Sequence, residues 1–438
     1  MPVIALLGVL TIASWWWLRA LGDVRTHLAA FLGCYAAAFA AYLALLRTIH
    51  ALQRRQPGPV QTRWLLSLIA LTAIASRLLL LPTRPTLSDD IYRYVWDGRV
   101  QLAGFDPYAY APSHPALAFL RNQNFSHINF PHLRTIYPPL TQQAFRLSAW
   151  LAPTLNAQKI VFVSMELLTC FALWIVLRVR RLSPLWLAAY AWHPLVILEI
   201  AGSGHNDALG IALLWVGIAA WQLKRPMGAA ISWAMAFVSK YATVILAPWV
   251  WCRREQRWML LIMGMLAAWP IACCPTIVSA LWESLSAMTT RFESNASVYL
   301  LVSTLVGHAG MARALVIGLW LAWLLWWARR EADPVRYFLG GFGVAMLLGP
   351  VLHPWYLVWI IPSFCFWRPP VFMALTALVV LAYSVWPGYL AGGTWRLPVW
   401  AHITEYGVVA VVALWSYRTW WWPSLSRLAT RPQRSVTS

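Results

Sequence analysis

Residues 1–22 read MPVIALLGVLTIASWWWLRALG and contain a single charged residue, Arg19. An apolar stretch of this length is long enough for a helix to cross about 30 Å of hydrocarbon. It has no basic region and no A-x-A cleavage site before its tryptophans, so we expect a retained first span rather than a cleaved signal peptide. Similar stretches recur along the whole chain, and this recurrence predicts an all-α polytopic membrane protein.

The composition excludes a soluble protein. Of the 438 residues 61% are hydrophobic and 11% are charged, whereas soluble domains are roughly 45–50% apolar and about 25% charged. The formal net charge of +20 would indicate nucleic acid in a soluble protein. Here the basic residues lie in short loops between apolar stretches, so they report membrane topology and we expect no nucleic-acid partner. We treat residues 1–438 as one integral membrane domain.

The apolar stretches predict about twelve transmembrane helices, interrupted by one broken segment. The expected spans are 2–22, 28–49, 64–82, 158–178, 184–201, 208–223, 257–277, 311–328, 335–352, 355–367, 370–387 and 403–420. Residues 228–240 and 241–252 are each too short to cross a membrane easily, and they meet at Ser239 and Lys240. We therefore expect a re-entrant or broken helix pair at 228–252, beside protein or a water-filled cavity.

The distribution of basic residues predicts the orientation. With a cytoplasmic N-terminus, 20 of the 34 Lys and Arg fall on the cytoplasmic side, as the positive-inside rule requires. A straight span at 228–252 would move every later basic cluster outside, so charge favours the re-entrant interpretation. Both termini are then cytoplasmic, and the long segment 83–157 is an outer loop. It is too rich in aromatic residues for disorder, and loops of this length are usually functional.

The outer loop opens with LSDDIYRYVWDGRVQLAG at residues 87–104. Helical spacing gives it an apolar face and a polar arc, which predicts an amphipathic helix on the membrane surface. A structural interpretation is that Ser88 caps this helix and that Asp89 and Asp90 complement its dipole. The functional alternative makes one aspartate a general base for a hydroxyl nucleophile. The polar arc consists of Asp90, Arg93, Tyr94, Asp97 and Gln101.

Four later motifs place polar and aromatic groups at the same predicted face. They are IYPPL at 136–140, GSGHNDALG at 202–210, the Ser239-Lys240 junction and GPVLHPWYLVW at 349–359. Each has a structural explanation: rigid proline loops, a helix cap at Asn206 or Asp207, a snorkelling lysine, or an interfacial aromatic belt. Taken together, they predict a water-accessible cavity with carboxylates, cations and aromatic rings. Cations are suited to bind a phosphate, and the depth of the cavity suggests that this phosphate is linked to a lipid.

Six motifs in one order resemble a known family. They are DIYRY at 90–94, GFDPYAYAP at 104–112, YPPL at 137–140, HNDAL at 205–209, SKY at 239–241 and HPWY at 353–356. The series resembles the bacterial polyprenol-phosphate-mannose-dependent mannosyltransferases related to the α-1,6-mannosyltransferase family, within the glycosyltransferase C superfamily. The resemblance covers residues from about 64 to 367.

That resemblance implies an enzyme of the bacterial inner (plasma) membrane with its active site on the periplasmic face. It would transfer a hexose, mannose by resemblance, from a polyprenyl-phosphate donor to a hydroxyl of a glycan or glycolipid, with inversion. The family's catalytic aspartate falls on Asp90, with the preceding Asp89 as the alternative. The cations expected at the donor phosphate are Arg77, Arg93, His205, Lys240 and His353. The residues expected at the sugar and acceptor are Asp97, Tyr137, Asn206, Asp207, Trp355 and Tyr356.

Two alternatives accompany this hypothesis. Asp89 and Asp90 are the pair that a divalent ion would need, but adjacent helical side chains diverge by about 100°, so we predict no cofactor and metal independence. A transporter or flippase of a lipid-linked or anionic solute would also suit a broken helix and an intramembrane lysine. The long aromatic loop 83–157, and the lack of an obvious inverted repeat, favour the transferase.

Overall fold

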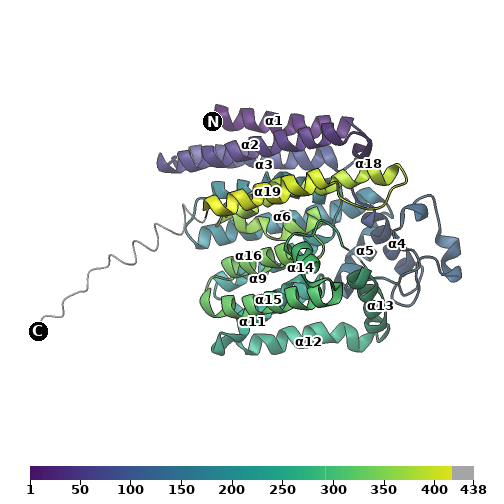
Figure 1. Ribbon diagram of the computed structural model, residues 1–438. Helices are drawn as coiled ribbons and strands as arrows, with labels where there is room; N and C mark the ends of the chain where they lie inside the picture. The colour runs from purple at the N-terminus through teal and green to yellow at the C-terminus, as the bar shows by residue number, and fades with distance from the viewer. Residues whose placement is uncertain (292, 417–438) are drawn as a thin grey trace, which may run out of the picture.

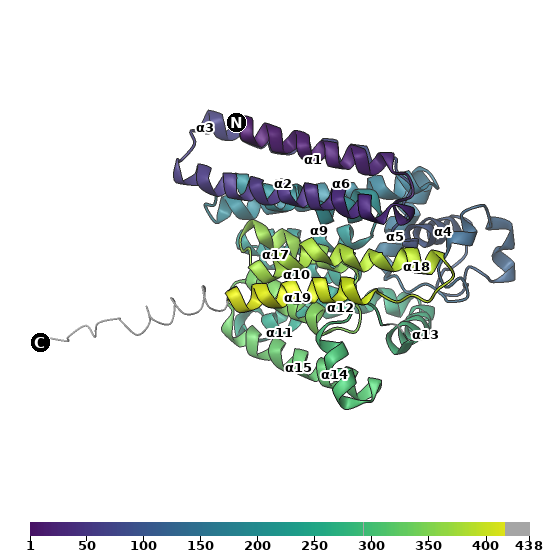
Figure 2. The same ribbon diagram turned by 45° about the horizontal axis from the view of Figure 1, so that its top comes forward.

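The computed structural model describes residues 1–291 and 293–416 and is built of helices throughout (Figure 1). Within that part of the chain the one β-type pairing is an isolated bridge between Ser294 and Val351. The all-α prediction is therefore confirmed. Most of the long helices run along one axis, whereas α13 lies across it (Figure 1). The N-terminus and the end of the last described helix lie at the same end of the bundle (Figures 1 and 2).

The first third of the chain forms an outer layer and the helices of the long loop. Its α1 packs against α2 and α3, at the top of Figure 1. The helices are α1 Pro2–Ala20, η1 Val24–Thr26, α2 Leu28–Arg54, α3 Pro59–Leu80, α4 Asp90–Leu102, η2 Pro115–Leu120, η3 Phe125–His127, α5 Pro139–Leu151 and α6 Leu155–Val179.

The middle third holds the bent and short helices at the centre of the bundle. One of them, η5, is a π-helix, in which the chain is wound more loosely than in an α-helix. The helices are η4 Pro184–Leu187, α7 Ala188–Ala191, α8 Pro194–Val196, η5 Ile197–Gly202, α9 Asp207–Gln222, α10 Pro226–Phe237, η6 Tyr241–Ile245, α11 Leu246–Trp251, η7 Arg254–Gln256, α12 Trp258–Cys273 and α13 Thr276–Arg291.

The last third returns to the bundle and ends on α19. Its helices are α14 Val298–Val306, α15 Ala309–Arg330, α16 Pro334–Leu348, η8 Pro354–Trp359, η9 Ile361–Cys365, α17 Pro370–Leu378, η10 Val379–Ser384, α18 Val385–Leu390 and α19 Val399–Ser416. Residues 417–420 of the last expected span lie outside the described residues.

Eight helices of the described chain are long and apolar enough to cross a membrane, and a ninth span is formed if one bent pair is counted. That pair, Pro184–Ala191 and Pro194–Gly202, bends by 53°. The count of about twelve is not confirmed. Two expected spans are helices of 16 and 15 residues, α9 and α16. The expected span at 355–367 is a pair of 3-10 helices, η8 and η9, whose residues are almost all buried in protein.

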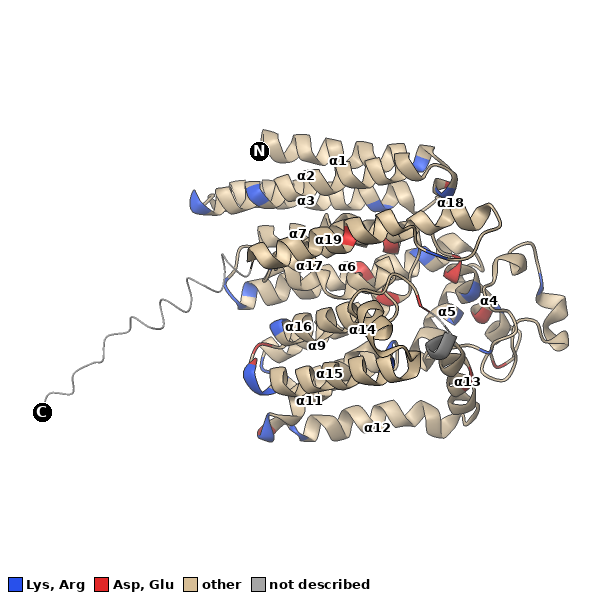
Figure 3. Ribbon diagram, in the orientation of Figure 1, with Lys and Arg blue, Asp and Glu red and all other residues tan. Residues whose placement is uncertain are grey.

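The break near Ser239 and Lys240 falls where it was predicted. Helix α10 ends at Phe237, and η6 begins at Tyr241. Figure 3 shows most Lys and Arg at the left ends of the helices, whereas Asp and Glu lie mainly in the interior and toward the right. The segment 83–157 lies on that right-hand side, opposite the ends where most of the basic residues gather (Figures 1 and 3).

Many tryptophans serve as links between helices rather than as interfacial residues. Trp15, Trp192, Trp215, Trp233, Trp249 and Trp359 are fully buried. The indole N–H of Trp192 donates to the carbonyl of Ile69 at 2.8 Å, and that of Trp320 donates to Gly341 at 2.9 Å. An indole thus fills space between helices and satisfies a buried carbonyl at once.

Helix α4, Asp90–Leu102, lies within the stretch 87–104 whose periodicity predicts a helix, but most of its residues are buried in the protein. It packs against α5 and α6, and residues on both of its faces are buried. Gly98 permits the close approach, because a Cβ there would lie 2.3 Å from the carbonyl oxygen of Phe145 in α5. The polar arc is turned into the protein, where it borders a cavity.

Candidate active site

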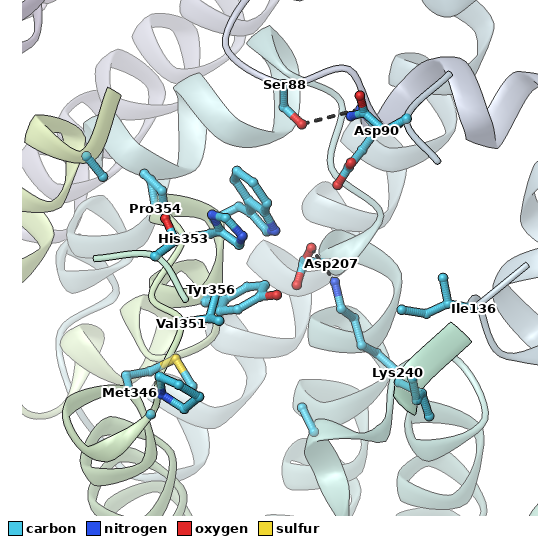
Figure 4. Close-up of a pocket in the computed structure, with 18 of the residues that line it drawn as sticks. Ser88, Asp90, Ile136, Asp207, Lys240, Met346, Val351, His353, Pro354 and Tyr356 are labelled. Carbon is cyan, nitrogen blue, oxygen red and sulfur yellow. Dashed lines mark hydrogen bonds and ion pairs between the residues drawn. The ribbon is translucent and has the colours of Figure 1, made fainter. Parts of the chain in front are cut away.

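A cavity of about 930 Å³ lies between α4, the segments 129–138 and 240–242, the end of α16, the segment 349–356 and α18 (Figure 4). Its lining combines carboxylates, cations and many aromatic rings. Pockets of this size and mixed character are the usual sites for ligands and substrates.

Asp90 opens α4 and points into this cavity. Its backbone N–H donates to the Ser88 hydroxyl at 3.4 Å, and its carboxylate faces the space above Asp207 (Figure 4). Among the described residues none donates a hydrogen bond to that carboxylate. Burial raises the pKa of Asp90 above its ordinary value of 3.8, and Asp207 adds to this rise, whereas His205 and Lys240 oppose it. A carboxylate with a raised pKa and no internal partner is suited to accept a proton.

Lys240 and Asp207 form an ion pair opposite Asp90. The ammonium lies 2.7 Å from Oδ2 of Asp207 and also donates to Oδ1 of Asn206 at 3.1 Å. The indole N–H of Trp359 donates to Oδ1 of Asp207 at 2.6 Å, so both carboxylate oxygens are occupied. Asp207 is fully buried, while the lysine side chain is 27% exposed and borders the cavity.

His205 belongs to a stack of three rings beside the cavity. Its ring lies 4.2 Å from that of Trp355, which in turn lies 4.3 Å from His353, all nearly parallel. Gly204 precedes it with φ +75°, a backbone conformation that side chains disfavour, and so allows the turn into α9. Burial, aided by the charges of His205 and Lys240, lowers the pKa of His353 to about 3, so it faces the cavity as a neutral donor.

Arg93 forms a second charged group on α4. Its Nε lies 2.7 Å from Asp97, and Nη1 donates to the carbonyl of Leu133 at 3.1 Å. The remaining Nη2 is buried and meets no partner among the described residues. Gln142 donates to the other oxygen of Asp97 at 2.8 Å, which fixes the pair. A ligand oxygen in the cavity would satisfy the open guanidinium nitrogen.

The family model of the alpha-(1->6)-mannopyranosyltransferase N-terminal domain matches residues 3–254, more than half of the chain. The chain belongs to this family. Alpha-(1->6)-mannopyranosyltransferase A of Mycobacterium tuberculosis is 27% identical over 329 residues, which are 64% of this chain and 61% of that relative. The chain thus matches about three fifths of the relative's length.

In this member of the mannopyranosyltransferase family, nine of the predicted site residues line the cavity. They are Asp89, Asp90, Arg93, Tyr137, Asp207, Lys240, His353, Trp355 and Tyr356. Three others contact residues of the lining. Asn206 accepts a hydrogen bond from Lys240, Asp97 accepts one from Arg93, and His205 stacks on Trp355. The family match ends before His353, and in the structure residues 353–356 line the same cavity as Asp90.

Arg77 lies elsewhere. It is buried in α3, forms an ion pair with Glu166 of α6 and donates to the carbonyls of Ala73 and Ala191. Ala191 ends α7 at the bend before α8, where a carbonyl freed by the break needs a donor. Arg77 therefore stabilises the bent helix pair, and we remove it from the proposed phosphate site.

A second group of residues at the candidate site was not predicted from the sequence. Glu199 lies in the π-helix, accepts a hydrogen bond from Tyr383 at 2.8 Å and lies 3.4 Å from the ring of His205. Tyr383, Trp386, Tyr389 and Trp395 line the cavity from the far end of the sequence. An acidic residue inside the expected span 184–201 was the available signal for Glu199, because membrane spans rarely contain one without a role.

Within the described part of the chain, no group of three or more His, Cys, Asp or Glu side chains is arranged to hold a metal ion. Asp89 and Asp90 therefore lack a third protein ligand of this kind there. Metal independence of this family member remains a prediction.

Proposed function

We propose that the protein transfers a mannosyl group from a polyprenyl-phosphate donor to a hydroxyl of a glycan or glycolipid, with inversion at the anomeric carbon. Family membership supports mannosyl transfer as the reaction class. The observation that carries the proposal is the Asp90 carboxylate, which faces the Lys240–Asp207 pair across one cavity and accepts no hydrogen bond from the described residues.

Asp90 is the proposed general base. It accepts the proton of the acceptor hydroxyl as that oxygen forms a bond to the anomeric carbon. The bond between the anomeric carbon and the phosphate oxygen breaks on the opposite side, and the polyprenyl phosphate leaves with the electron pair. One displacement of this kind inverts the anomeric centre.

Lys240 and Arg93 are the proposed phosphate ligands. Both line the cavity, and both are held from behind by a carboxylate, Asp207 or Asp97. Such support fixes each cation in place, so little rearrangement is needed as charge builds on the leaving phosphate. The neutral His353 and the Tyr356 hydroxyl supply further donors.

The polyprenyl chain is proposed to leave the cavity beside α15 and α16. Val316 and Ile317 of α15 and Met346 of α16 line this part of the cavity, and Ile317 is 54% exposed on the surface of the bundle. An apolar wall that continues to the membrane-facing surface suits a lipid chain.

The active site is proposed to face the periplasm, with both termini in the cytoplasm. The concentration of Lys and Arg at the opposite ends of the helices supports this orientation, since basic residues mark the cytoplasmic side (Figure 3).

The test uses purified protein reconstituted in lipid. A panel of polyprenyl-phosphate sugars is supplied with and without a cell-envelope glycolipid extract, and products are followed by mass spectrometry, with the anomeric configuration read by NMR. The proposal predicts that the mannosyl donor is consumed and that a mannose of inverted configuration appears on the acceptor. Failure of every donor, together with movement of the lipid-linked sugar between leaflets, would favour a flippase instead.

A further inference from the structure

Three aromatic side chains form a corner in the wall of the cavity. Trp386 and Tyr389 lie on α18, and Trp395 lies in the loop that follows. The ring centroids lie 5.9 Å apart for Trp386 and Tyr389, 5.0 Å for Trp386 and Trp395, and 5.2 Å for Tyr389 and Trp395. The planes meet at 74°, 83° and 77° respectively. Rings at these separations and angles pack edge to face, so the three side chains hold one another in fixed orientations at the cavity wall.

The corner is joined to the segment that carries Asp90. The indole N–H of Trp386 donates to the carbonyl of Leu87 at 3.3 Å. The Arg25 guanidinium lies over the Trp386 ring, 5.1 Å from its centroid, and forms an ion pair of 2.7 Å with Asp23. Trp386 is thus fixed in position relative to the start of α4.

These rings differ from an interfacial aromatic belt, in which tryptophans face lipid headgroups. Trp386 is only 6% exposed, and it faces the cavity. Tyr389 is 47% exposed and forms the accessible edge of the corner. The three rings thus form a wall of the cavity in which Trp386 is buried and Tyr389 is accessible.

Asp89 supplies a polar group beside the corner. It borders the cavity and is partly exposed. It precedes Asp90, the first residue of α4. Burial raises the pKa of Asp89, and the charge of Arg25, whose guanidinium lies over Trp386, opposes this rise. The described cations lining the cavity lie on other segments: Arg93, Arg134, Lys240 and Arg313. The Arg25 guanidinium beside Trp386 is already paired with Asp23. Aromatic planes with one carboxylate, and with their nearest guanidinium already paired, suit an uncharged, hydroxyl-rich ring better than a phosphate.

We propose that Trp386, Tyr389 and Trp395, with Asp89, bind the acceptor as a neutral pyranose and present its hydroxyl to Asp90. The apolar C–H face of the sugar packs on the rings, and its hydroxyls donate to Asp89. This inference deepens the proposed function and rests on it for the identity of the occupant. It places the acceptor beside α18 and the donor phosphate beside Lys240, on different sides of the base.

The test measures binding to the full chain in lipid nanodiscs, without turnover. The probes are an α-(1→6)-linked mannotriose for the corner and farnesyl phosphate for the phosphate ligands. We expect Tyr389→Ala and Trp395→Ala each to weaken mannotriose binding by about tenfold and to leave farnesyl phosphate binding unchanged. Tyr389→Phe keeps the ring and should bind the sugar normally. Trp400→Ala, at a 52% exposed position on α19, is the matched control.

Two outcomes would overturn the inference: wild-type protein that does not bind mannotriose, or alanine variants that bind it as well as wild type does. The result is separable from the proposed function. Transfer with unaltered sugar binding in the variants would retain the function and reject the corner. Sugar binding that is lost in the variants, without transfer from any donor, would retain the corner and reject the function.

Discussion

Lys240 lies 2.7 Å from Asp207, and this ion pair connects the break between α10 and η6 to the first residue of α9. The buried carboxylate, together with Asn206, holds the end of the lysine side chain at the cavity. The break in the helix therefore places Lys240 opposite Asp90 (Figure 4).

Removing Lys240 should affect both folding and donor binding. Lys240→Met leaves Asp207 buried without its partner, at a cost of about 3 kcal/mol. The double variant Lys240→Met with Asp207→Asn should recover most of the thermal stability, yet its KM for the donor should stay high. Melting temperature and donor KM in detergent measure the two effects. A double variant with normal donor KM would exclude Lys240 from the phosphate site.

Arg77, unlike Lys240, should affect the stability of the protein but not its binding of the donor. Arg77→Met leaves the buried Glu166 uncompensated and should lower stability by about 3–5 kcal/mol. Arg77→Met with Glu166→Leu should restore much of that stability together with a normal donor KM, because neither residue lines the cavity. Melting curves and steady-state kinetics check this, and a raised donor KM in a stable double variant would return Arg77 to the site.

The pH profile should report the environment of Asp90. An acid must be ionised to act as a base, so activity falls as the pH drops through its pKa, which lies above the ordinary 3.8. Lys240→Met removes a charge that lowers this pKa, so the acid limb of kcat/KM should move to higher pH. Asp207→Asn removes a charge that raises it, so the limb should move to lower pH. Acid limbs that stay fixed in both variants would contradict the assignment.

Glu199 should matter although it does not line the cavity. Glu199→Gln removes the negative charge that lies 3.4 Å from the His205 ring and accepts from the Tyr383 hydroxyl. Weakening one interaction with a charged group in this way costs about 1.5 kcal/mol, or roughly tenfold in kcat. Tyr383→Phe removes one of the two contacts and should have a smaller effect. Measuring kcat beside the melting temperature separates positioning from folding. A stable Glu199→Gln variant with normal kcat would show that the contact is dispensable.

The long spans were predictable because a lipid-crossing helix needs an uninterrupted apolar run. The segment 355–367 has such a run for another reason: its side chains are buried in protein, and hydropathy does not distinguish protein from lipid. The opposite error is a helix that was expected to be loop. Helices α13 and α5 are of this kind, because their mixed polarity does not produce an apolar run.

The candidate site was predictable where its residues stand in short polar motifs, as in the segments containing Asp90, Asp207, Lys240 and His353. Contacts across the fold were not predictable. Tyr383 meets Glu199 across 184 residues of sequence, and Trp386 meets Leu87 across 299. Arg77 is a residue that was wrongly predicted to belong to the site. An arginine in an apolar span indicates function only if it has no structural partner, and the sequence does not show that its partner is Glu166.

The central claim is that Asp90 is the base, and the most direct measurement compares Asp90→Asn with Asp89→Asn in reconstituted protein supplied with polyprenyl-phosphate mannose and acceptor. We predict that Asp90→Asn lowers kcat by about 10²–10⁴-fold while the protein stays folded and still binds donor, and that Asp89→Asn mainly raises the acceptor KM. A folded Asp90→Asn variant with wild-type kcat, or loss of kcat in Asp89→Asn alone, would contradict the account.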